Sequence, residues 1–362
     1  MRATLPLEIT PMMVLSSSAP EIHTPPEWDS GETYPLGAIR KVAGDYKIYE
    51  SLEPDNQGNP PGVSPLWWRV LGPTETPYSS LATYPLGATC SHDRWCFESL
   101  AADNTGHPLP VWPERKTAWW INVATTNKWA MFDLSRTTQT VTEGPLTVRV
   151  ALRQRANTIG IGGMRGNSLE ISATSVTGGG AVYPNGHSRS KTGVFDLNTR
   201  QVNNYYEFAF EPFSTRASHV IFDLPPYSDI IVTVTLSSST GNVKCGSMVF
   251  GTYIFIGSVI GPVVADTRGF TDYTYDNYGN KEIVVKRSLP LAKLKLRLPS
   301  YLLNKVNAAK MELEGKVALW TGLDDPALDW FDTLQIFGVW TKFAFGNKTN
   351  NHVEIDLETE EM

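Results

Sequence analysis

Two adjacent tryptophan pairs, Trp67-Trp68 and Trp119-Trp120, are the residues of this chain best suited to binding chemistry. Sugars bind to proteins by stacking the apolar faces of their rings on aromatic planes, with hydrogen bonds at the rim. Because neighbours on a strand point to opposite faces, one tryptophan of each pair should be buried and the other should face outward. The sequence does not say which one. Three further aromatic residues are secondary candidates for such a surface: Tyr34, Tyr84 and Trp112.

Catalytic chemistry has one candidate, a cluster of carboxylates close to Trp320 and Trp330. Paired carboxylates at a fixed separation hydrolyse glycosidic bonds. Nothing in the sequence fixes the geometry of this cluster or perturbs its pKa values, so we interpret it as a solvated loop. The chain is therefore predicted not to be an enzyme. The four residues of the cluster are Asp324, Asp325, Asp329 and Asp332.

Metal and phosphate sites are not indicated by the sequence. The six histidines are scattered without ligand spacing, so we predict no metal and no cofactor. The glycine-rich run at residues 160–166 lacks the Gly-Lys-Ser/Thr of a phosphate loop, and we interpret it as a surface loop. Segments of the form Asp-Asn-x-Gly begin at Asp55, Asp103 and Asp276. They are interpreted as turns, because a calcium loop needs more oxygen ligands.

The first third of the chain contains an internal repeat. The offset between its two copies is 50 residues at the first landmark, 48 at the next two and 52 at the tryptophan pairs. Fixed strand landmarks separated by loops of variable length are typical of a duplicated folded unit. Three matched segments define the repeat besides the tryptophan pairs: TYPLGA at 33–38 and 83–88, ESL at 50–52 and 98–100, and DNxGxP at 55–60 and 103–108.

Each copy carries aromatic, glycine and proline residues at the same places. In the first copy these are Trp28, Tyr34, Gly37, Tyr49, Asn56, Gly58, Pro60 and Trp67. In the second they are Tyr78, Tyr84, Gly87, Phe97, Asn104, Gly106, Pro108 and Trp119. This pattern resembles the small chitin-binding-type modules of carbohydrate-binding module family 5/12, with Tyr78 in place of the leading tryptophan. Sugar binding and a purely structural role both remain open, because so small a unit needs most of its aromatics for its core.

Short motifs outside the repeat extend the resemblance along the chain. They lie at residues 9–28, 126–133 (TNKWAMFD), 245–251 (CGSMVFG), 272–273, 276–280 and 337–343 (FGVWTKF). Together with the two modules, they resemble a family of structural proteins of bacteriophage tails and baseplates. The resemblance implies a virion protein that assembles in the host bacterial cytoplasm as a symmetric homo-oligomer or docked on one. Its neighbours would be other tail or baseplate proteins.

We predict a mainly β fold in five segments. An extended N-terminal arm (residues 1–26) precedes two small three-stranded carbohydrate-binding-type modules (27–72 and 78–124). An antiparallel β-sandwich follows over residues 125–350, with one helix near the C-terminus, and residues 351–362 form a solvated acidic tail.

The one expected helix spans residues 301–312, where Leu302, Val306, Ala309 and Leu313 form an apolar stripe. Residues 205–210 are expected to be one of the strands of the sandwich.

Composition agrees with a globular β protein. Hydrophobic residues make up 41% of the 362 residues and charged residues 19%, and glycine and proline are plentiful. A net charge of −6 without a basic stripe argues against nucleic-acid binding. The uncharged stretch at residues 246–265 is interpreted as buried β-structure rather than a membrane span. Cys90 and Cys96 flank a short hairpin, and two packed thiols are favoured over a bond.

We therefore expect a structural component of a phage tail or baseplate whose tandem modules contact host-surface polysaccharide. One alternative is a purely architectural tail adaptor without sugar binding. Another is a polysaccharide-degrading enzyme with appended binding modules. The enzyme is disfavoured, because residues 1–20 do not make a good signal peptide.

Overall fold

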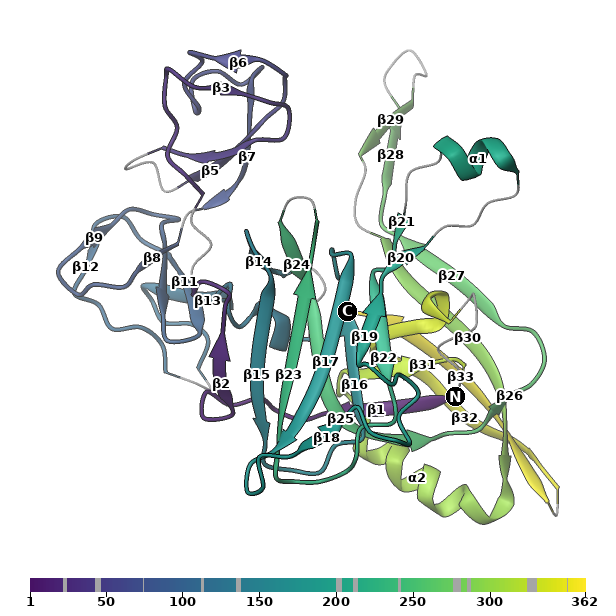
Figure 1. The fold of residues 1–362 in the computed structure, drawn as a ribbon. Coiled ribbons are helices and arrows are strands. Elements are labelled where there is room, and N and C mark those ends of the chain that lie inside the picture. Colours follow the sequence, from purple (N-terminus) through teal and green to yellow (C-terminus); the bar gives the residue numbers. More distant parts are fainter. Residues whose placement is uncertain are drawn as a thin grey trace. The chain divides into compact units, whose positions relative to one another are not determined.

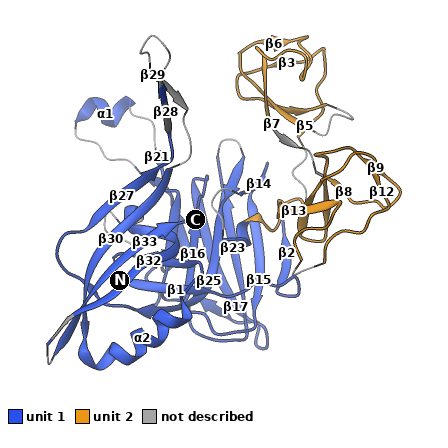
Figure 2. Cartoon of the chain, turned by 180° about the vertical axis from the view of Figure 1, so that it is seen from behind, with its two compact units in different colours: residues 1–18, 131–362 blue, residues 19–130 orange. Residues whose placement is uncertain are grey.

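In the computed structural model, the chain forms two compact units, residues 1–18 with 131–362 and residues 19–130 (Figure 2). The fold is mainly β, with curled antiparallel sheets and one helix near the C-terminus, so the predicted fold class is confirmed. The structure describes the following residues: 1–21, 25–42, 47–73, 75–111, 114–134, 138–199, 204–210, 214–239, 242–275, 281–284, 288–323, 331–349 and 351–362.

The first module of the smaller unit is a three-stranded antiparallel sheet with a short two-stranded ladder (Figure 1). The sheet has the order β4 (Ile39–Lys41), β5 (Lys47–Ser51) and β7 (Trp68–Pro73). In the ladder, β3 (Thr33–Tyr34) pairs with β6 (Asn56–Gln57). A bulge between Ile48 and Tyr49 shifts the pairing of β5 with β7.

The second module repeats this arrangement and adds a strand. Its ladder joins β9 (Thr83–Tyr84) to β12 (Asn104–Thr105). Its sheet has four strands instead of the predicted three, because β8 pairs in parallel with β10. In the first module the same place holds a single parallel bridge between Glu27 and Lys41. The sheet order is β13 (Trp120–Thr125), β11 (Trp95–Ser99), β10 (Thr89–His92) and β8 (Glu75–Pro77).

The larger unit contains two large antiparallel sheets. The ten-stranded sheet has the order β22 (Ser218–Ile221), β16 (Thr158–Gly162), β25 (Ser247–Phe255), β1 (Arg2–Pro6), β31 (Ala318–Thr321), β32 (Gln335–Lys348), β33 (His352–Glu361), β30 (Ser288–Pro299) and β26 (Ser258–Val259), with β27 (Val264–Gly269) also on β30. The six-stranded sheet has the order β18 (Ala181–Tyr183), β17 (Ser168–Ser175), β23 (Ile230–Ser237), β15 (Leu146–Leu152) and β2 (Val14–Ser17), with β19 (Val194–Asp196) also on β17.

Three two-stranded ladders and several short helices complete this unit. The ladders join β14 (Thr140–Thr142) to β24 (Val243–Cys245), β20 (Asn198–Thr199) to β21 (Ser214–Thr215), and β28 (Asp272–Tyr275) to β29 (Lys281–Val284). The helices are η1 (Ala130–Phe132), α1 (Tyr205–Phe210), η2 (Ser300–Leu302), α2 (Leu303–Glu312) and η3 (Asp332–Leu334).

The six-stranded sheet follows the expected alternation of buried and exposed side chains. Every second residue of β15 and β23 is buried, as the apolar residues at those positions require. Both figures place this sheet beside β16 and β25 of the ten-stranded sheet (Figures 1 and 2). Residues 246–265 contribute β25, β26 and the start of β27 to the ten-stranded sheet. The prediction of buried β-structure is confirmed for the first half of β25. It is wrong for β26 and β27, whose residues are exposed or only partly buried.

The ten-stranded sheet curls until strands from its two halves touch. A Cβ atom on Gly160 would lie 2.2 Å from Cδ2 of Leu319, and one on Gly162 would lie 2.4 Å from Cε2 of Phe337. These contacts join β16 to β31 and β32, although β25 and β1 lie between them in the sheet. The prediction of a surface loop at the glycine run is therefore wrong for its first residues, because these glycines make room for the opposing side chains.

The N-terminal residues are part of the core of the larger unit. β1 lies between β25 and β31, and the α-amino group of Met1 donates a buried hydrogen bond to the carbonyl oxygen of Gly257 at 2.8 Å. β2 pairs with β15 at the edge of the other sheet. The predicted extended arm is therefore wrong for residues 1–18, whose apolar side chains are buried at Met1, Ala3, Ile9 and Met13.

The acidic C-terminal segment is a strand and not a solvated tail. β33 pairs with β32 on one side and β30 on the other. Val353, Ile355 and Leu357 face inward, while the acidic residues between them face outward. Three outward carboxylates pair with cations on other strands of the sheet: Glu354 with Lys295 of β30, Glu358 with Lys342 of β32, and Glu360 with Arg268 of β27. Four of the five acids thus lie on the outer face of an amphipathic strand, while Glu361 at its end is buried.

Helix α2 confirms the expected helix, with Val306, Ala309 and Leu313 buried along its stripe. Residues 205–210, expected to be a strand, form helix α1 instead. Asn204 caps this helix: its side-chain oxygen accepts from the Glu207 N–H at 2.9 Å, and its amide donates to the Glu207 carboxylate at 2.7 Å. This N-terminal cap outweighs the strand preference of the aromatic residues. No helix in the described part of the chain is long and apolar enough to span a membrane.

We expect Gly160→Ala and Gly162→Ala each to lower the free energy of unfolding of the larger unit by roughly 1–3 kcal/mol, because the added methyl group overpacks a closed interior. Chemical denaturation of the full chain measures this effect. Gly144→Ala is the matched control, because a Cβ atom there meets nothing within 4 Å. Equal unfolding midpoints for all three variants would contradict the curled packing.

Candidate functional site

Each module of the smaller unit is built around the second tryptophan of its pair. Trp68 is 3% exposed and Trp120 is 1% exposed. Tyr34 meets Trp68 edge-on with ring centroids 5.4 Å apart, and Tyr84 meets Trp120 in the same way at 5.1 Å. Edge-on pairs of this kind stabilise a core beyond the area they bury. A third buried ring completes each core: Tyr49 or Phe97.

The indole N–H groups of these two tryptophans are satisfied inside their modules. Trp68 Nε1 donates to the carbonyl oxygen of Asn59 at 2.7 Å, and Trp120 Nε1 donates to that of His107 at 3.0 Å. Asn59 and His107 occupy equivalent places, 48 residues apart. Burial and bonded donors together make Trp68 and Trp120 structural residues.

A buried asparagine holds the backbone of the first tryptophan in each pair. Asn56 Nδ2 donates to the carbonyl oxygen of Trp67 at 3.3 Å, and Asn104 Nδ2 donates to that of Trp119 at 3.2 Å. The same amides donate to a serine hydroxyl at the end of β5 or β11, at 2.9 and 3.0 Å. This repeated network fixes the main chain from inside the module.

Trp67 and Trp119 are the outward members of the two pairs. Each is only partly buried and packs on the edge of its core cluster. The His107 imidazole stacks on the Trp119 ring, with ring centroids 3.6 Å apart and planes 9° apart. In the first module Asn59 takes the place of that histidine, and its side chain bonds to Asn56 at 3.0 Å. Both modules therefore have a partly exposed tryptophan at this position, but only in the second is a histidine ring stacked on it.

The two candidate tyrosines lie inside the modules. Tyr34 is 1% exposed and Tyr84 is 2% exposed. The Tyr34 hydroxyl donates to the carbonyl oxygen of Asp29 at 2.8 Å, and the Ser79 N–H donates to the Tyr84 hydroxyl at 2.7 Å. Both hydroxyl groups are thus hydrogen-bonded to the backbone of their own module, and the two tyrosines are core residues. The remaining aromatic candidate, Trp112, lies outside the described residues.

The two Asp-Asn-x-Gly segments of the modules are turns, as predicted. Asp55 and Asp103 both have φ of 55°, and Gly58 and Gly106 have φ of 70° and 73°. Asparagine, aspartate and glycine adopt this left-handed conformation more readily than other residues. The third such segment, which starts at Asp276, lies outside the described residues.

Trp95 is an aromatic residue that sequence reasoning did not select. It begins β11, is partly buried, and has the Arg94 guanidinium 5.2 Å from its ring centroid. The equivalent position of the first module, 48 residues earlier, is Lys47. The first module therefore has no matching aromatic residue, and the repeat did not indicate Trp95 as a candidate.

All three cysteines are buried and none is in a disulfide, which confirms the expectation of packed thiols for Cys90 and Cys96. In the hairpin of β10 and β11, Cys90 faces Phe97 and Ser91 faces Cys96, so the two cysteines are one position out of register. Burial raises the pKa of Cys90 and of Cys245 to about 12, which keeps both thiols protonated and unreactive at neutral pH.

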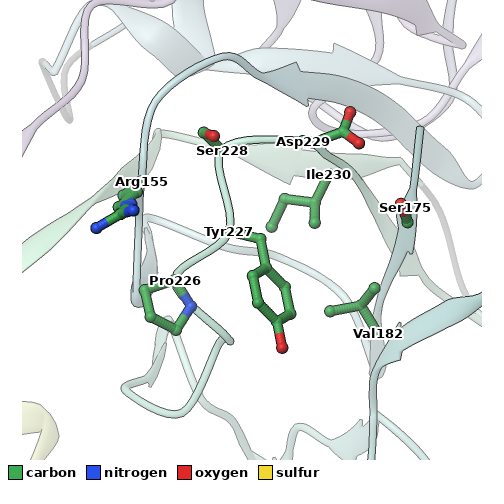
Figure 3. Close-up of a pocket in the computed structure, with 8 residues that line it drawn as sticks. All are labelled: Arg155, Ser175, Val182, Pro226, Tyr227, Ser228, Asp229 and Ile230. Atoms are coloured by element: carbon green, nitrogen blue, oxygen red, sulfur yellow. The ribbon is translucent and has the colours of Figure 1, made fainter. Parts of the chain in front are cut away.

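A pocket of about 340 Å³ opens in the larger unit beside the start of β23 (Figure 3). Figure 3 shows the Tyr227 ring between Pro226 and Val182, with Arg155 and Asp229 at the margin. The Asp229 carboxylate accepts hydrogen bonds from the N–H and hydroxyl of Thr177 and is thus engaged in a turn. One engaged carboxylate does not make the paired acids that glycoside hydrolysis requires.

Three of the four residues of the predicted acidic cluster, Asp324, Asp325 and Asp329, lie outside the described residues. Asp332 begins η3. Trp320 is fully buried in β31, and its indole N–H donates to the carbonyl oxygen of Gly338 at 3.0 Å. Over the described ranges, no group of three or more His, Cys, Asp and Glu residues is placed to hold a metal ion.

Comparison of the chain with protein-family models and with curated proteins found no match.

We expect Trp68→Ala and Trp120→Ala to destabilise their modules by about 3–5 kcal/mol, as for other buried tryptophans. Trp67→Ala and Trp119→Ala should cost much less, because these rings are partly exposed. Thermal unfolding of the full chain, followed by tryptophan fluorescence, separates the two classes. The division into core and surface rings would be wrong if the first tryptophan of a pair mattered as much as the second.

Proposed function

We propose that this chain is a non-enzymatic structural component of a bacteriophage tail or baseplate, and that its two modules contact host-surface glycans through Trp67 and Trp119. The observation that carries this proposal is the repeated placement of one outward tryptophan. In both modules the second ring is used by the core, and a buried asparagine holds the first ring's backbone. Partly exposed aromatic rings of this kind suit the apolar faces of sugar rings, and in the second module the His107 imidazole covers one face of Trp119.

Duplication supports glycan contact for a further reason. A single aromatic platform binds a sugar weakly, whereas two linked sites raise the overall affinity by about 10²–10⁴ when both engage one polymer. A symmetric virion would multiply the effect again. The resemblance of the short motifs to tail and baseplate proteins, from residue 9 to residue 343, supports the virion assignment in the same way.

Helix α1 supports a role in assembly. It carries four aromatic side chains that are each more than half exposed, and none of its six residues is buried. Monomeric soluble proteins rarely leave such clusters in water, so a protein neighbour is favoured. We propose that other tail or baseplate proteins, or further copies of this chain in a symmetric homo-oligomer, are the neighbours. The four residues are Tyr205, Tyr206, Phe208 and Phe210.

A glycan array probed with the full chain tests the glycan contact. The array should contain chitin oligosaccharides and bacterial surface polysaccharides. We expect binding to fall at least tenfold in Trp67→Ala or Trp119→Ala alone, because one of two linked sites is lost, and to disappear in the double variant.

Leu66→Ala is the matched control, because Leu66 is an apolar neighbour that is 81% exposed and belongs to no repeated feature. It should leave binding unchanged. If the folded chain binds no glycan, or if the double variant binds as well as the parent, the modules are architectural and the glycan part of the proposal is overturned.

A further inference from the structure

The two modules differ at one equivalent position beside the buried asparagine that holds the first tryptophan. Asn59 occupies this position in the first module and His107 in the second, in each case directly before the proline of the DNxGxP segment. The buried asparagine and its serine partner are the same in both copies. The effect of this one side chain can therefore be compared in two otherwise matched sites.

In the first module the side chain at this position completes a hydrogen-bond network. Asn59 Nδ2 donates to Asn56 Oδ1 at 3.0 Å and to the carbonyl oxygen of Gln57 at 3.2 Å. Asn56 Nδ2 in turn donates to the Ser51 hydroxyl and to the carbonyl oxygen of Trp67. Both ends of the buried Asn56 amide are thus bonded, and the Asn59 side chain is engaged within its own turn.

In the second module the same network is incomplete. Asn104 Nδ2 donates to the Ser99 hydroxyl and to the carbonyl oxygen of Trp119, but Asn104 Oδ1 is buried without a partner among the described residues. The side chain that would donate to it is an imidazole, which lies on the Trp119 ring instead. A buried unpaired acceptor destabilises a fold. Natural proteins depart from such local rules mainly at functional sites.

The imidazole projects from a main chain that two core rings hold in place. The carbonyl oxygen of His107 accepts a hydrogen bond from Trp120 Nε1 at 3.0 Å and another from the Tyr78 hydroxyl at 2.9 Å. In the first module Trp28 stands where Tyr78 does, and it has no hydroxyl group to donate. The second module therefore fixes the backbone of this residue with one more bond than the first.

The stacked imidazole covers one face of the Trp119 ring in the way a sugar ring would. The two ring centroids are 3.6 Å apart and the planes are 9° apart, which is carbon contact distance. A sugar places its apolar face on an aromatic ring in the same parallel manner. Trp119 also packs against the core cluster of its module, which covers a further part of the ring. The covered face is closed to a sugar while the imidazole stays in place.

We propose that His107 makes the two modules unequal: it covers Trp119, so the second module binds glycan more weakly than the first and opens fully only when the imidazole swings aside. This inference rests on the proposed glycan contact. Breaking a stacked ring pair before a sugar can bind lowers the affinity about three- to tenfold. Trp67, with Asn59 beside it, is accordingly the stronger site.

His107→Asn in the full chain tests the proposal, both in the parent and in a Trp67→Ala chain, where only the second module can bind. The introduced amide should pair with Asn104 Oδ1, as in the first module, and leave Trp119 uncovered. We expect glycan binding in the Trp67→Ala chain to rise about three- to tenfold on the array. The melting temperature of the smaller unit should also rise, because pairing a buried acceptor outweighs a lost stack.

His187→Asn is the matched control, because it makes the same exchange at an exposed histidine of the larger unit and should change neither quantity. The proposal is overturned if the parent binds glycan and His107→Asn leaves binding unchanged or weakens it in both chains. A chain that binds no glycan with or without His107→Asn has a different meaning: it overturns the proposed glycan contact itself, and this inference with it.

Discussion

The edge-on contact between a buried tryptophan and a buried tyrosine holds each small module together. A unit of about 45 residues buries little surface, so a few large rings must supply most of its core. Trp68 and Trp120 do this, and each also anchors its indole N–H on a backbone carbonyl. Trp67 and Trp119 directly precede β7 and β13, and each lies partly exposed at the edge of that core. The surface ring is thus a consequence of how the core is made.

The larger unit obeys a different constraint, which is the closing of a wide sheet on itself. Strongly twisted sheets of this size curl instead of staying open. Curling brings β16 against β31 and β32, and only glycine at positions 160 and 162 leaves space for the opposing side chains. The same curl places an outer strand, β22, beside the edge of the six-stranded sheet.

Periodicity and repetition in the sequence were enough to predict the mainly β fold, the two modules as repeated landmarks, α2, and strands such as β15 and β23. The phase of each tryptophan pair was not predictable, because it depends on a bulge in β5 and β11 and on which carbonyl reaches the indole. Three errors had readable signals. Val353, Ile355 and Leu357 alternate with the terminal acids, Asn204 is an N-cap residue with Glu207 three positions later, and isoleucines alternate with glycines in β16. In each case the prediction followed the most conspicuous residues, which were the acids, the aromatics or the glycines. The pattern of the residues beside them indicated the observed structure.

The central claim is that a glycan meets the first tryptophan of each pair and leaves the second untouched. Indole N–H resonances of the eleven tryptophans, recorded on the full chain with and without the glycan bound best on an array, test this directly. Replacing one tryptophan at a time assigns the signals. We expect the signals of Trp67 and Trp119 to shift, while those of Trp68 and Trp120, whose indole N–H groups are bonded to the carbonyl oxygens of Asn59 and His107, stay in place. Shifts confined to other tryptophans, or no shift at all, would contradict it.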